Sequence, residues 1–568
     1  MECRVSVQIA RRGASRLNRT LLLLAVPCAV LVLVLNIYPL GSAVWESLNH
    51  GDLIGAAPFV GLRNYAYLLT FSEFWRAVLF TAVYVACGVF GGWALGLALA
   101  LLLRTRVPLA GVWRALLMLP WIVPNIISLG FGWNWLMNDK GSPVLLVLRA
   151  LGDTHPDVLA HPLFAQIVVC ACRVWQSYPF MLLMMSSALA SVDGSAYEAA
   201  QVDGAGRWKI LTRITLPMIS KTSYVAWILM AIFCLNDFQS IAALTGGDPQ
   251  GATRTLILFA WEWGNFAHFG TGVGYATATG VLMTIVLVAV SVVLYRRTQR
   301  PGADWAVAAD GVGGFTGLSG SAKGRWWRLL MIIVITVILL TPLKEVLYQF
   351  VLGGGSAAGF FANIAASFAA STLPMLERSL VLASVTIVVC LIVAAPAGYA
   401  IARGRGKLLG AIRAVIFTVQ SFPVLLLLWP MFMMFYWIQL LDTFVSVQIG
   451  HIAMALGFAT WMFSAFVQSL PTELEEAAWT DGCSVVGAFF RVVLPSAVPA
   501  VISTGLFVFL LSWGDWQIAG NILITNANYP LAKGDPISFV FIVLPVVLFF
   551  ALNRYFSLGG VATSFSRR

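Results

Sequence analysis

Long apolar runs dominate this sequence and limit what it can fold into. A helix needs about 20 apolar residues to cross a hydrocarbon core roughly 30 Å thick. Of the 568 residues, 60% are hydrophobic and only 10% are charged, whereas a soluble globular protein carries roughly 25% charged residues. We therefore predict an all-α membrane protein with about twelve spanning helices, at 20–40, 77–103, 113–137, 163–190, 222–244, 274–295, 328–350, 379–402, 412–438, 444–468, 498–523 and 536–553.

Positive charge orients these helices. Most of the 35 lysines and arginines lie in segments that are cytoplasmic when the N-terminus is inside, which follows the positive-inside rule. Both termini are then predicted to be cytoplasmic. The net charge of +11 reflects this topology, because a nucleic-acid role would need a basic face on a soluble domain. The apolar run 21–40 is long for a signal peptide and has no small-residue cleavage site, so we expect an uncleaved first helix.

Cysteine and histidine are too scattered to predict a metal or redox site. Among eight cysteines, Cys170 and Cys172 are the only close pair, and the five histidines lie far apart. Cysteines inside apolar spans behave as small buried hydrophobes. We therefore expect no metal site.

One hydrophilic stretch occurs twice, 278 positions apart. Glu198–Pro217 reads EAAQVDGAGRWKILTRITLP, and Glu476–Pro495 reads EAAWTDGCSVVGAFFRVVLP, with eight identical residues in register. Two gap-free copies at matching places between apolar runs indicate a tandem duplication. We predict two domains of six spans each, 1–298 and 325–568, joined by a Gly-rich cytoplasmic linker, 299–324. The repeated stretches then form two cytoplasmic loops, at about 192–217 and 470–495.

The residues of each copy favour a helix–turn–helix on the inner membrane surface. The Glu-Ala-Ala triplet favours helix, and its small side chains allow another protein to approach closely. The following glycine lets the backbone turn out of the helix, and the proline stands where a new helix can begin. A single copy would be an ordinary amphipathic connector; two copies predict a docking surface. Its residues are Glu198, Ala199, Ala200, Asp203, Gly204 and Pro217 in the first copy, and Glu476, Ala477, Ala478, Asp481, Gly482 and Pro495 in the second.

Polar residues inside apolar spans are candidates for a solute path, because they are costly in a membrane. Several lie beside tryptophans, and an aromatic face next to a hydrogen-bonding group suits a polyhydroxylated ligand. The alternative is that these residues hydrogen-bond neighbouring helices or cap span ends. The candidates are Asn134, Asn236, Asp237 and Gln239 in the first half, and Gln420, Asp515, Gln517 and Asn521 in the second. No catalytic constellation accompanies them, so we predict a transport protein and no enzyme.

The repeated EAA, DG and LP elements resemble the coupling loop of binding-protein-dependent ABC import permeases. The resemblance covers nearly the whole chain, with each half similar to one permease domain. In the first half it rests also on Phe59–Leu69, Trp113–Val144 and Asn236–Leu256, which are similar to the carbohydrate-type branch. The second half resembles the partner permease in Ser512–Trp516 and in its final residues. It departs from that pattern in Asn528–Pro536 and lacks the usual basic-glycine terminus.

This resemblance implies a fused permease subunit of the bacterial inner membrane. The loop helices are then the ATPase-coupling residues, inserted into an ABC ATPase dimer at the cytoplasmic face, and a solute-binding protein docks outside. No cofactor is expected on this chain; ATP and Mg²⁺ are used by the ATPase, since the sequence has no P-loop of its own. The carbohydrate-type motifs imply a sugar, polyol or glycerol-phosphate-like solute. In that family the fifth span of the first-half-type permease contributes to the sugar site, which implies Asn236 and Asp237.

Two alternatives remain open from the sequence. Fused permeases of the same class also serve ferric iron, thiamine, polyamines or aminoalkylphosphonates. A secondary transporter of twelve spans in two halves would share the span count and the long linker. It predicts no repeated amphipathic loop, and usually an acid between spans two and three, where this chain has RTRVPLAGVWR (Arg104–Arg114).

Overall fold

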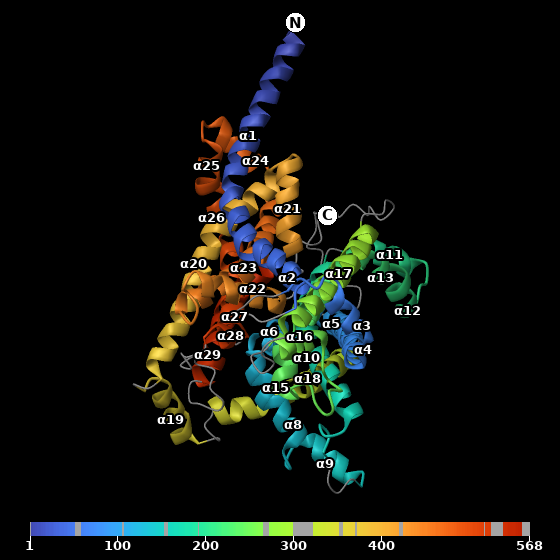
Figure 1. Ribbon diagram of the computed structural model, residues 1–568. Helices are drawn as coiled ribbons and strands as arrows, with labels where there is room; N and C mark the ends of the chain where they lie inside the picture. The colour runs from blue at the N-terminus through green and yellow to red at the C-terminus, as the bar shows by residue number, and fades with distance from the viewer. Residues whose placement is uncertain are drawn as a thin grey trace. The chain divides into compact units, whose positions relative to one another are not determined.

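The structure is a computed structural model, and its described residues are mostly helical (Figure 1). It describes residues 2–50, 58–104, 107–152, 157–190, 192, 194–264, 272–298, 322–351, 356–369, 372–419, 424–515, 517–523 and 538–558. Over these ranges the only β-type pairing is an isolated bridge between Asn49 and Phe59.

The chain divides into two compact units. The first takes its described residues from Met1–Glu46, Pro374–Pro530 and Ala551–Phe565, and the second takes them from Ser47–Leu373 and Leu531–Phe550. Helices of the first unit are α1 (Glu2–Val32), α2 (Tyr38–Ser47), α20 (Leu373–Arg403), α21 (Lys407–Val419), α22 (Val424–Trp437), α23 (Phe444–Ser469), α24 (Glu473–Thr480), α25 (Val485–Ala488), α26 (Leu494–Ser496), α27 (Val498–Trp513) and α28 (Gln517–Ile522).

The second unit contains the helices between α2 and α20. They are α3 (Arg63–Thr70), α4 (Ser72–Ala86), α5 (Gly92–Leu103), α6 (Ala110–Ile122), α7 (Asn125–Ile127), α8 (Asn134–Asn138), α9 (Pro143–Ala150), α10 (Pro162–Ala190), α11 (Gly194–Val202), α12 (Arg207–Ile210), α13 (Leu216–Met218), α14 (Ser220–Leu235), α15 (Gln239–Leu244), α16 (Leu256–Gly264), α17 (Gly272–Thr298), α18 (Ala322–Val346) and α19 (Ala357–Ser367). The last helix, α29 (Ser538–Leu558), contributes residues to both units.

Eight helical segments in the described ranges are long and apolar enough to cross a membrane. A ninth span is possible if Arg207–Met218 and Ser220–Leu235, which meet at a bend of 67°, count as one. These nine correspond to nine of the twelve predicted spans. The number twelve stays a prediction, because the third, ninth and twelfth predicted spans contain shorter apolar helices: Ala110–Ile122, Leu427–Trp437 and Phe539–Leu552.

The third predicted span is not one helix, and a proline explains why. Helix α6 ends at Ile122, Val123 is extended with ψ 128°, and a new helical turn starts at Asn125 after Pro124. Proline disfavours helical backbone in the residue before it and cannot donate a hydrogen bond to the preceding turn. The apolar run continues through the break, so hydropathy alone could not locate it.

The first helix of the chain packs among helices of the second sequence half. In α1, Cys28 Sγ lies 3.3 Å from Thr460 Oγ1 of α23, and Asn18 Oδ1 accepts a hydrogen bond from the Arg405 amide. Its buried side chains share one hydrophobic cluster with residues of α20, α23 and the segment after α25: Leu21, Ala25, Tyr399, Phe463, Phe466 and Phe489.

The first helix of the second half, α18, packs in turn among helices of the first half. Trp175 Nε1 of α10 donates a 2.6 Å hydrogen bond to the Leu339 carbonyl. Lys344 Nζ lies 5.5 Å from the centre of the Trp135 ring. The compact units therefore do not coincide with the sequence halves 1–298 and 325–568, because each half exchanges its first helix. Most of the predicted linker, 299–321, lies outside the described residues, and α18 already begins at Ala322.

Small residues allow α10 to lie unusually close to the second span of the first half. Gly88, Gly92 and Gly96 repeat every four residues on one face of that span. A Cβ atom on Gly92 would lie 2.6 Å from Ser177 Cβ, and one on Gly96 would lie 2.7 Å from the Leu182 amide nitrogen. Such small-xxx-small faces let helix backbones approach in membranes. They fix α10 as the central helix of this unit.

Candidate functional site

The two repeated stretches adopt the same backbone. Helix α11 in the first copy and α24 in the second are each followed, two residues after their last residue, by a glycine with left-handed φ, +69° at Gly204 and +85° at Gly482. The amide of Ala205 donates to the Ala200 carbonyl, and the amide of Cys483 donates to the Ala478 carbonyl, both at 2.9 Å. This glycine-terminated pattern closes a helix end. The predicted helix–turn–helix is therefore present in both copies, continued by α12–α13 and α25–α26.

The two copies also expose the same residues. The first alanine of each EAA triplet is exposed, while the second, Ala200 or Ala478, is buried. Each copy therefore presents one face outward and packs the other against its own unit. The exposed residues common to both are Glu198, Ala199, Asp203, Gly204 and Pro217, and Glu476, Ala477, Asp481, Gly482 and Pro495. Their predicted docking role remains a prediction.

An arginine at the end of the second span anchors the first copy. Arg104 Nη1 donates a 3.0 Å hydrogen bond to the hydroxyl of Tyr197, the residue directly before Glu198. The guanidinium carbon also lies 4.7 Å from the Tyr197 ring centre. Tyr197 is buried and its hydroxyl lies 3.3 Å from Thr215 Oγ1, on the far side of the turn. Arg104 thus holds the first arm of the element, and Tyr197 connects that arm to the second.

The second copy uses an ion pair at the equivalent place. Arg403, at the end of α20, contacts Glu475 Oε1 at 2.7 Å through its guanidinium. Tyr399 donates a 3.0 Å hydrogen bond to the other carboxylate oxygen. Glu475 immediately precedes Glu476, and its side chain is only 2% exposed. Sequence reasoning missed both anchors, because a basic residue at an inner helix end is also what topology alone predicts.

In the first half, the predicted path residue Asp237 is buried and fully engaged. It lies in the break between α14 and α15, where Arg173 Nη1 contacts its Oδ2 at 2.5 Å. Tyr84 donates a 2.6 Å hydrogen bond to the same oxygen, and the Ser240 amide donates to Oδ1 at 3.2 Å. The arrangement matches the alternative of a helix cap bonded to neighbouring spans. Sequence reasoning missed Arg173, an ionisable residue inside the fourth span.

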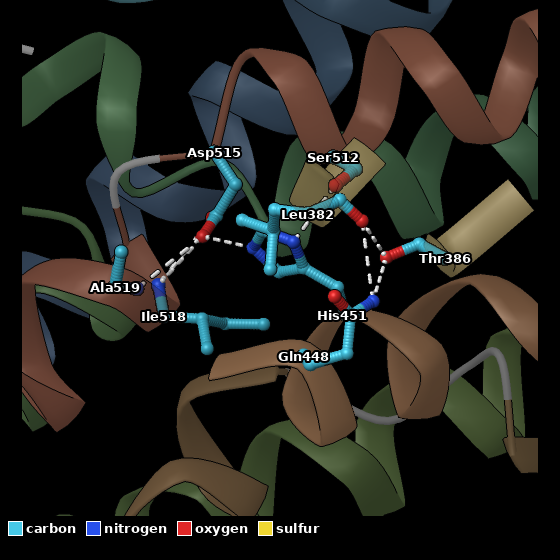
Figure 2. A network of polar contacts seen from close by, with 8 residues as sticks. All are labelled: Leu382, Thr386, Gln448, His451, Ser512, Asp515, Ile518 and Ala519. Atoms are coloured by element: carbon cyan, nitrogen blue, oxygen red, sulfur yellow. Dashed lines mark hydrogen bonds and ion pairs between the residues drawn. The ribbon is translucent and has the colours of Figure 1, made fainter. Parts of the chain in front are cut away.

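Figure 2 shows the corresponding network of the second half. His451 of α23 lies between two partners, with Nδ1 2.8 Å from Ser512 Oγ and Nε2 2.9 Å from Asp515 Oδ2. Asp515 lies in the break between α27 and α28 and accepts the Ile518 amide at 3.1 Å. Gln448, one turn before His451, donates to Thr386 Oγ1 at 2.5 Å. Asp515, a predicted path residue, is thus also buried and paired.

The other predicted path residues are less engaged. Asn236 is half-buried and donates to the Ile232 carbonyl at 2.9 Å, inside its own helix. Asn134 is half-buried and accepts from Asn138 at 2.8 Å. Gln239 is half-buried at the start of α15. Gln420 lies outside the described residues, as do the side chains of Gln517 and Asn521.

Two buried donors lie on the segments around the first network. Gln176 accepts a 3.0 Å hydrogen bond from Ser240 through Oε1. Within the described part of the chain, its Nε2 and the Trp133 Nε1 have no hydrogen-bond partner. The Trp133 and Trp175 rings meet edge to face at 5.8 Å. Buried polar groups are normally satisfied, so these two donors are exceptions among the described residues.

Comparison with known proteins identifies the family. Residues 88–300 and 392–557 each match the family described as binding-protein-dependent transport system inner membrane component. The trehalose/maltose transport system permease protein MalF of Thermococcus litoralis is 36% identical over 280 residues, which are 49% of this chain and 92% of that protein. The trehalose transport system permease protein SugA of Mycobacterium tuberculosis is 29% identical over 54% of this chain and 98% of its own length.

A third relative differs in the solute that it is named for. The sn-glycerol-3-phosphate transport system permease protein UgpA of Yersinia enterocolitica is 29% identical over 49% of this chain and 93% of its own length. Each of these relatives corresponds to about half of this chain, while the family matches two separate segments. The predicted fusion of two permease domains is therefore confirmed. The chain belongs to the inner membrane components of binding-protein-dependent transport systems, as a transport component in which two such domains are joined.

Proposed function

We propose that this chain forms the solute path of an ATP-driven importer and that an ABC ATPase dimer docks on the two helix–turn–helix elements. The observation that supports this most directly is that both elements share one backbone and one set of exposed residues. Two copies of a single groove on an ATPase dimer would then accept both. Exposed apolar side chains next to these residues, Val202 and Trp208 in the first copy and Phe490 in the second, supply contact area.

The chain itself provides the solute path and the two docking elements, and the energy comes from ATP hydrolysis by the ATPase. ATP and Mg²⁺ bind to the ATPase, since this sequence contains no P-loop. A solute-binding protein delivers the cargo at the outer face of a bacterial inner membrane. Closure of the ATPases moves both docking elements, and the spans attached to them switch the path between its two openings.

We propose a sugar, a polyol or a glycerol-phosphate-like compound as the cargo. The named relatives carry trehalose, maltose or glycerol 3-phosphate, and all are polyhydroxylated. The half-buried Asn236 and the unpartnered donors of Gln176 and Trp133 suit hydroxyl groups beside aromatic rings. Asp237 is less suited to direct contact, because its carboxylate is already bonded to Arg173 and Tyr84.

The first test is ATP hydrolysis by the complete complex. The tagged chain is purified in lipid with the ATPase that binds it, and its binding protein is loaded in turn with sugars, polyols, glycerol 3-phosphate, phosphonates and ferric iron. We expect a polyhydroxylated solute to stimulate hydrolysis. Stimulation by ferric iron or a phosphonate alone would reject the proposal of a polyhydroxylated cargo. Uptake that follows a proton or sodium gradient, with no ATPase bound, would reject the proposal of an ATP-driven importer.

The docking elements are tested by charge reversal at their exposed glutamates. Glu198→Lys combined with Glu476→Lys should abolish uptake and ATPase binding, while membrane insertion stays intact, because both side chains are exposed and make no fold-supporting contact in the described structure. A matched variant, Glu377→Lys, changes an exposed glutamate near the start of α20, far along the chain from both elements. Normal transport by the double variant would reject docking at these sites.

A further inference from the structure

The two buried acid–base pairs occupy equivalent positions in the two sequence halves. Asp515 follows Asp237 by 278 positions, and His451 follows Arg173 by the same number, which is also the spacing of Glu198 and Glu476. In both halves the acid and the base are 64 residues apart. We propose that Arg173–Asp237 and His451–Asp515 are positioning pairs that join each coupling element, the helix–turn–helix of Glu198–Pro217 or Glu476–Pro495, to the break in the fifth span of its half. This rests on the proposed function.

In each pair the carboxylate bonds the same two kinds of partner. It binds the base on the fourth span, and it accepts the backbone amide three residues ahead, Ser240 or Ile518, at the start of the short helix after the break. A side-chain acceptor at this place satisfies an amide that the helix leaves free. The short helices α15 and α28 are therefore tied to the fourth span of their own half through one carboxylate.

A third equivalent contact supports the repeat. Ser512 precedes Asp515 by three residues and bonds His451. Cys234 likewise precedes Asp237 by three, and its thiol lies beside the Arg173 side chain, both against Gly88. The base of each half thus contacts the end of the fifth-span helix on one side of the break and the acid within the break. The base therefore bridges the break in the fifth span.

The fourth span links this contact to the cytoplasmic element. Helix α10 continues unbroken for 17 residues from Arg173 to Ala190, roughly 26 Å along its axis, and α11 begins four positions later. Helix α23 continues for 18 residues from His451 to Ser469, roughly 27 Å, and α24 follows at the same spacing. A displacement of the coupling element is therefore delivered to the break by a single continuous helix.

Electrostatics makes this connection hard to release. Arg173 and Asp237 are 8% and 5% exposed, and His451 and Asp515 are 0% and 4% exposed. A carboxylate or guanidinium left without its partner at membrane depth is costly. When the fourth span moves, α15 and α28 therefore move with it, and the wall of the path changes on both sides of the break.

The two pairs differ in strength. Arginine is charged at every physiological pH. In the first pair, Arg173 also donates a 3.1 Å hydrogen bond to Ser177 Oγ, and Tyr84 donates one of 2.6 Å to Asp237. In the second half, His451 contacts Asp515 Oδ2 at 2.9 Å through Nε2 alone, because its Nδ1 is engaged by Ser512. The first half is accordingly the more tightly connected half, and loss of its pair should reduce coupling more than loss of the second pair.

The test separates coupling from folding and from ATPase docking. Asp237→Asn and Asp515→Asn are made in the complete complex, with Ala242→Cys on α15 or Gly520→Cys on α28 as labelling reporters. Solute carried per ATP hydrolysed and the ATP-dependent change in thiol labelling are both measured. We expect ATPase binding and basal hydrolysis to persist, solute per ATP to fall about tenfold or more, and the labelling change to disappear.

Two further variants keep the test decisive if an asparagine variant does not fold. The reversed pair Arg173→Asp with Asp237→Arg should recover part of the coupling lost in Asp237→Asn, and His451→Arg should keep the coupling of the second half. Unchanged solute per ATP and unchanged labelling in both asparagine variants would overturn the inference while leaving the importer intact. A wild-type complex that binds no ATPase would instead overturn the proposed function.

Discussion

The ion pair between Arg403 and Glu475, beneath the second helix–turn–helix, gives a quantitative prediction. Glu475→Gln keeps the shape of the side chain but removes the charge that faces Arg403. Glu475 is 2% exposed and Arg403 is 12% exposed, so solvent offers the guanidinium little replacement. Breaking a buried pair from one side costs about 3–5 kcal/mol. We expect the lower end, about 3 kcal/mol, because Arg403 keeps a 2.9 Å hydrogen bond to the Leu470 carbonyl.

This cost should appear locally, in the helix that Glu475 anchors. Hydrogen exchange of the α24 amides reports the free energy of local opening, and about 3 kcal/mol corresponds to about a hundredfold faster exchange. Glu476→Gln is the matched control, since its side chain on the same helix is exposed. It should leave α24 exchange unchanged.

The first half supplies an internal comparison. Tyr197→Phe removes the hydroxyl that accepts from Arg104 and contacts Thr215, and the ring stays beneath the guanidinium. A hydrogen bond between a charged group and a neutral partner contributes about 1.5 kcal/mol at the lower end, so α11 exchange should rise about tenfold. Exchange of α24 in Glu475→Gln that stays within about threefold of wild type, or a larger effect of Tyr197→Phe, would refute the ranking of the charged anchor above the neutral one.

Three other substitutions test separate features of the fold. Gly96→Ala should strongly reduce the yield of folded protein, because its Cβ would lie 2.7 Å from the Leu182 backbone nitrogen, whereas Gly111→Ala on α6, with no atom within 4 Å, should not. Gly482→Ala should cost about 1–2 kcal/mol through its left-handed φ alone, since its Cβ would meet nothing within 4 Å; unchanged α24 exchange would contradict this. Glu73→Gln should change thermal stability by less than about 1 kcal/mol, because its bond to Arg254 is half exposed. A larger loss would show that this outer ion pair is structural.

Local sequence signals predicted local structure well. The left-handed glycines, Gly204 and Gly482, and the buried second alanine of each triplet follow from residue type and register. The break before Asn125 follows from Pro124. Where apolar composition continued through such a break, the span prediction was too long, because hydropathy measures the cost of transfer into lipid and is insensitive to backbone geometry.

Local sequence signals did not predict which residues, distant in the chain, contact the buried acids. Asp237 and Asp515 were identified as costly polar residues within the membrane, yet Arg173 and His451 were not recognised as their bases. The equal spacing of 278 positions could have shown it, since the repeat places an ionisable residue at the same point of the fourth span in both halves. Arg104 and Arg403 were hidden differently, because arginine at an inner helix end is explained by topology alone.

The sequence by itself determined that this chain lies in a membrane, that it is a duplication, and that each half carries one exposed helix–turn–helix. These features depend on transfer free energy, repetition and backbone preference, all of which are local along the chain. Only the tertiary structure decided that α1 and α18 are exchanged between the halves and that each buried acid meets a base 64 residues away. Apolar burial is non-directional, so an apolar helix gives no indication of which half it will join.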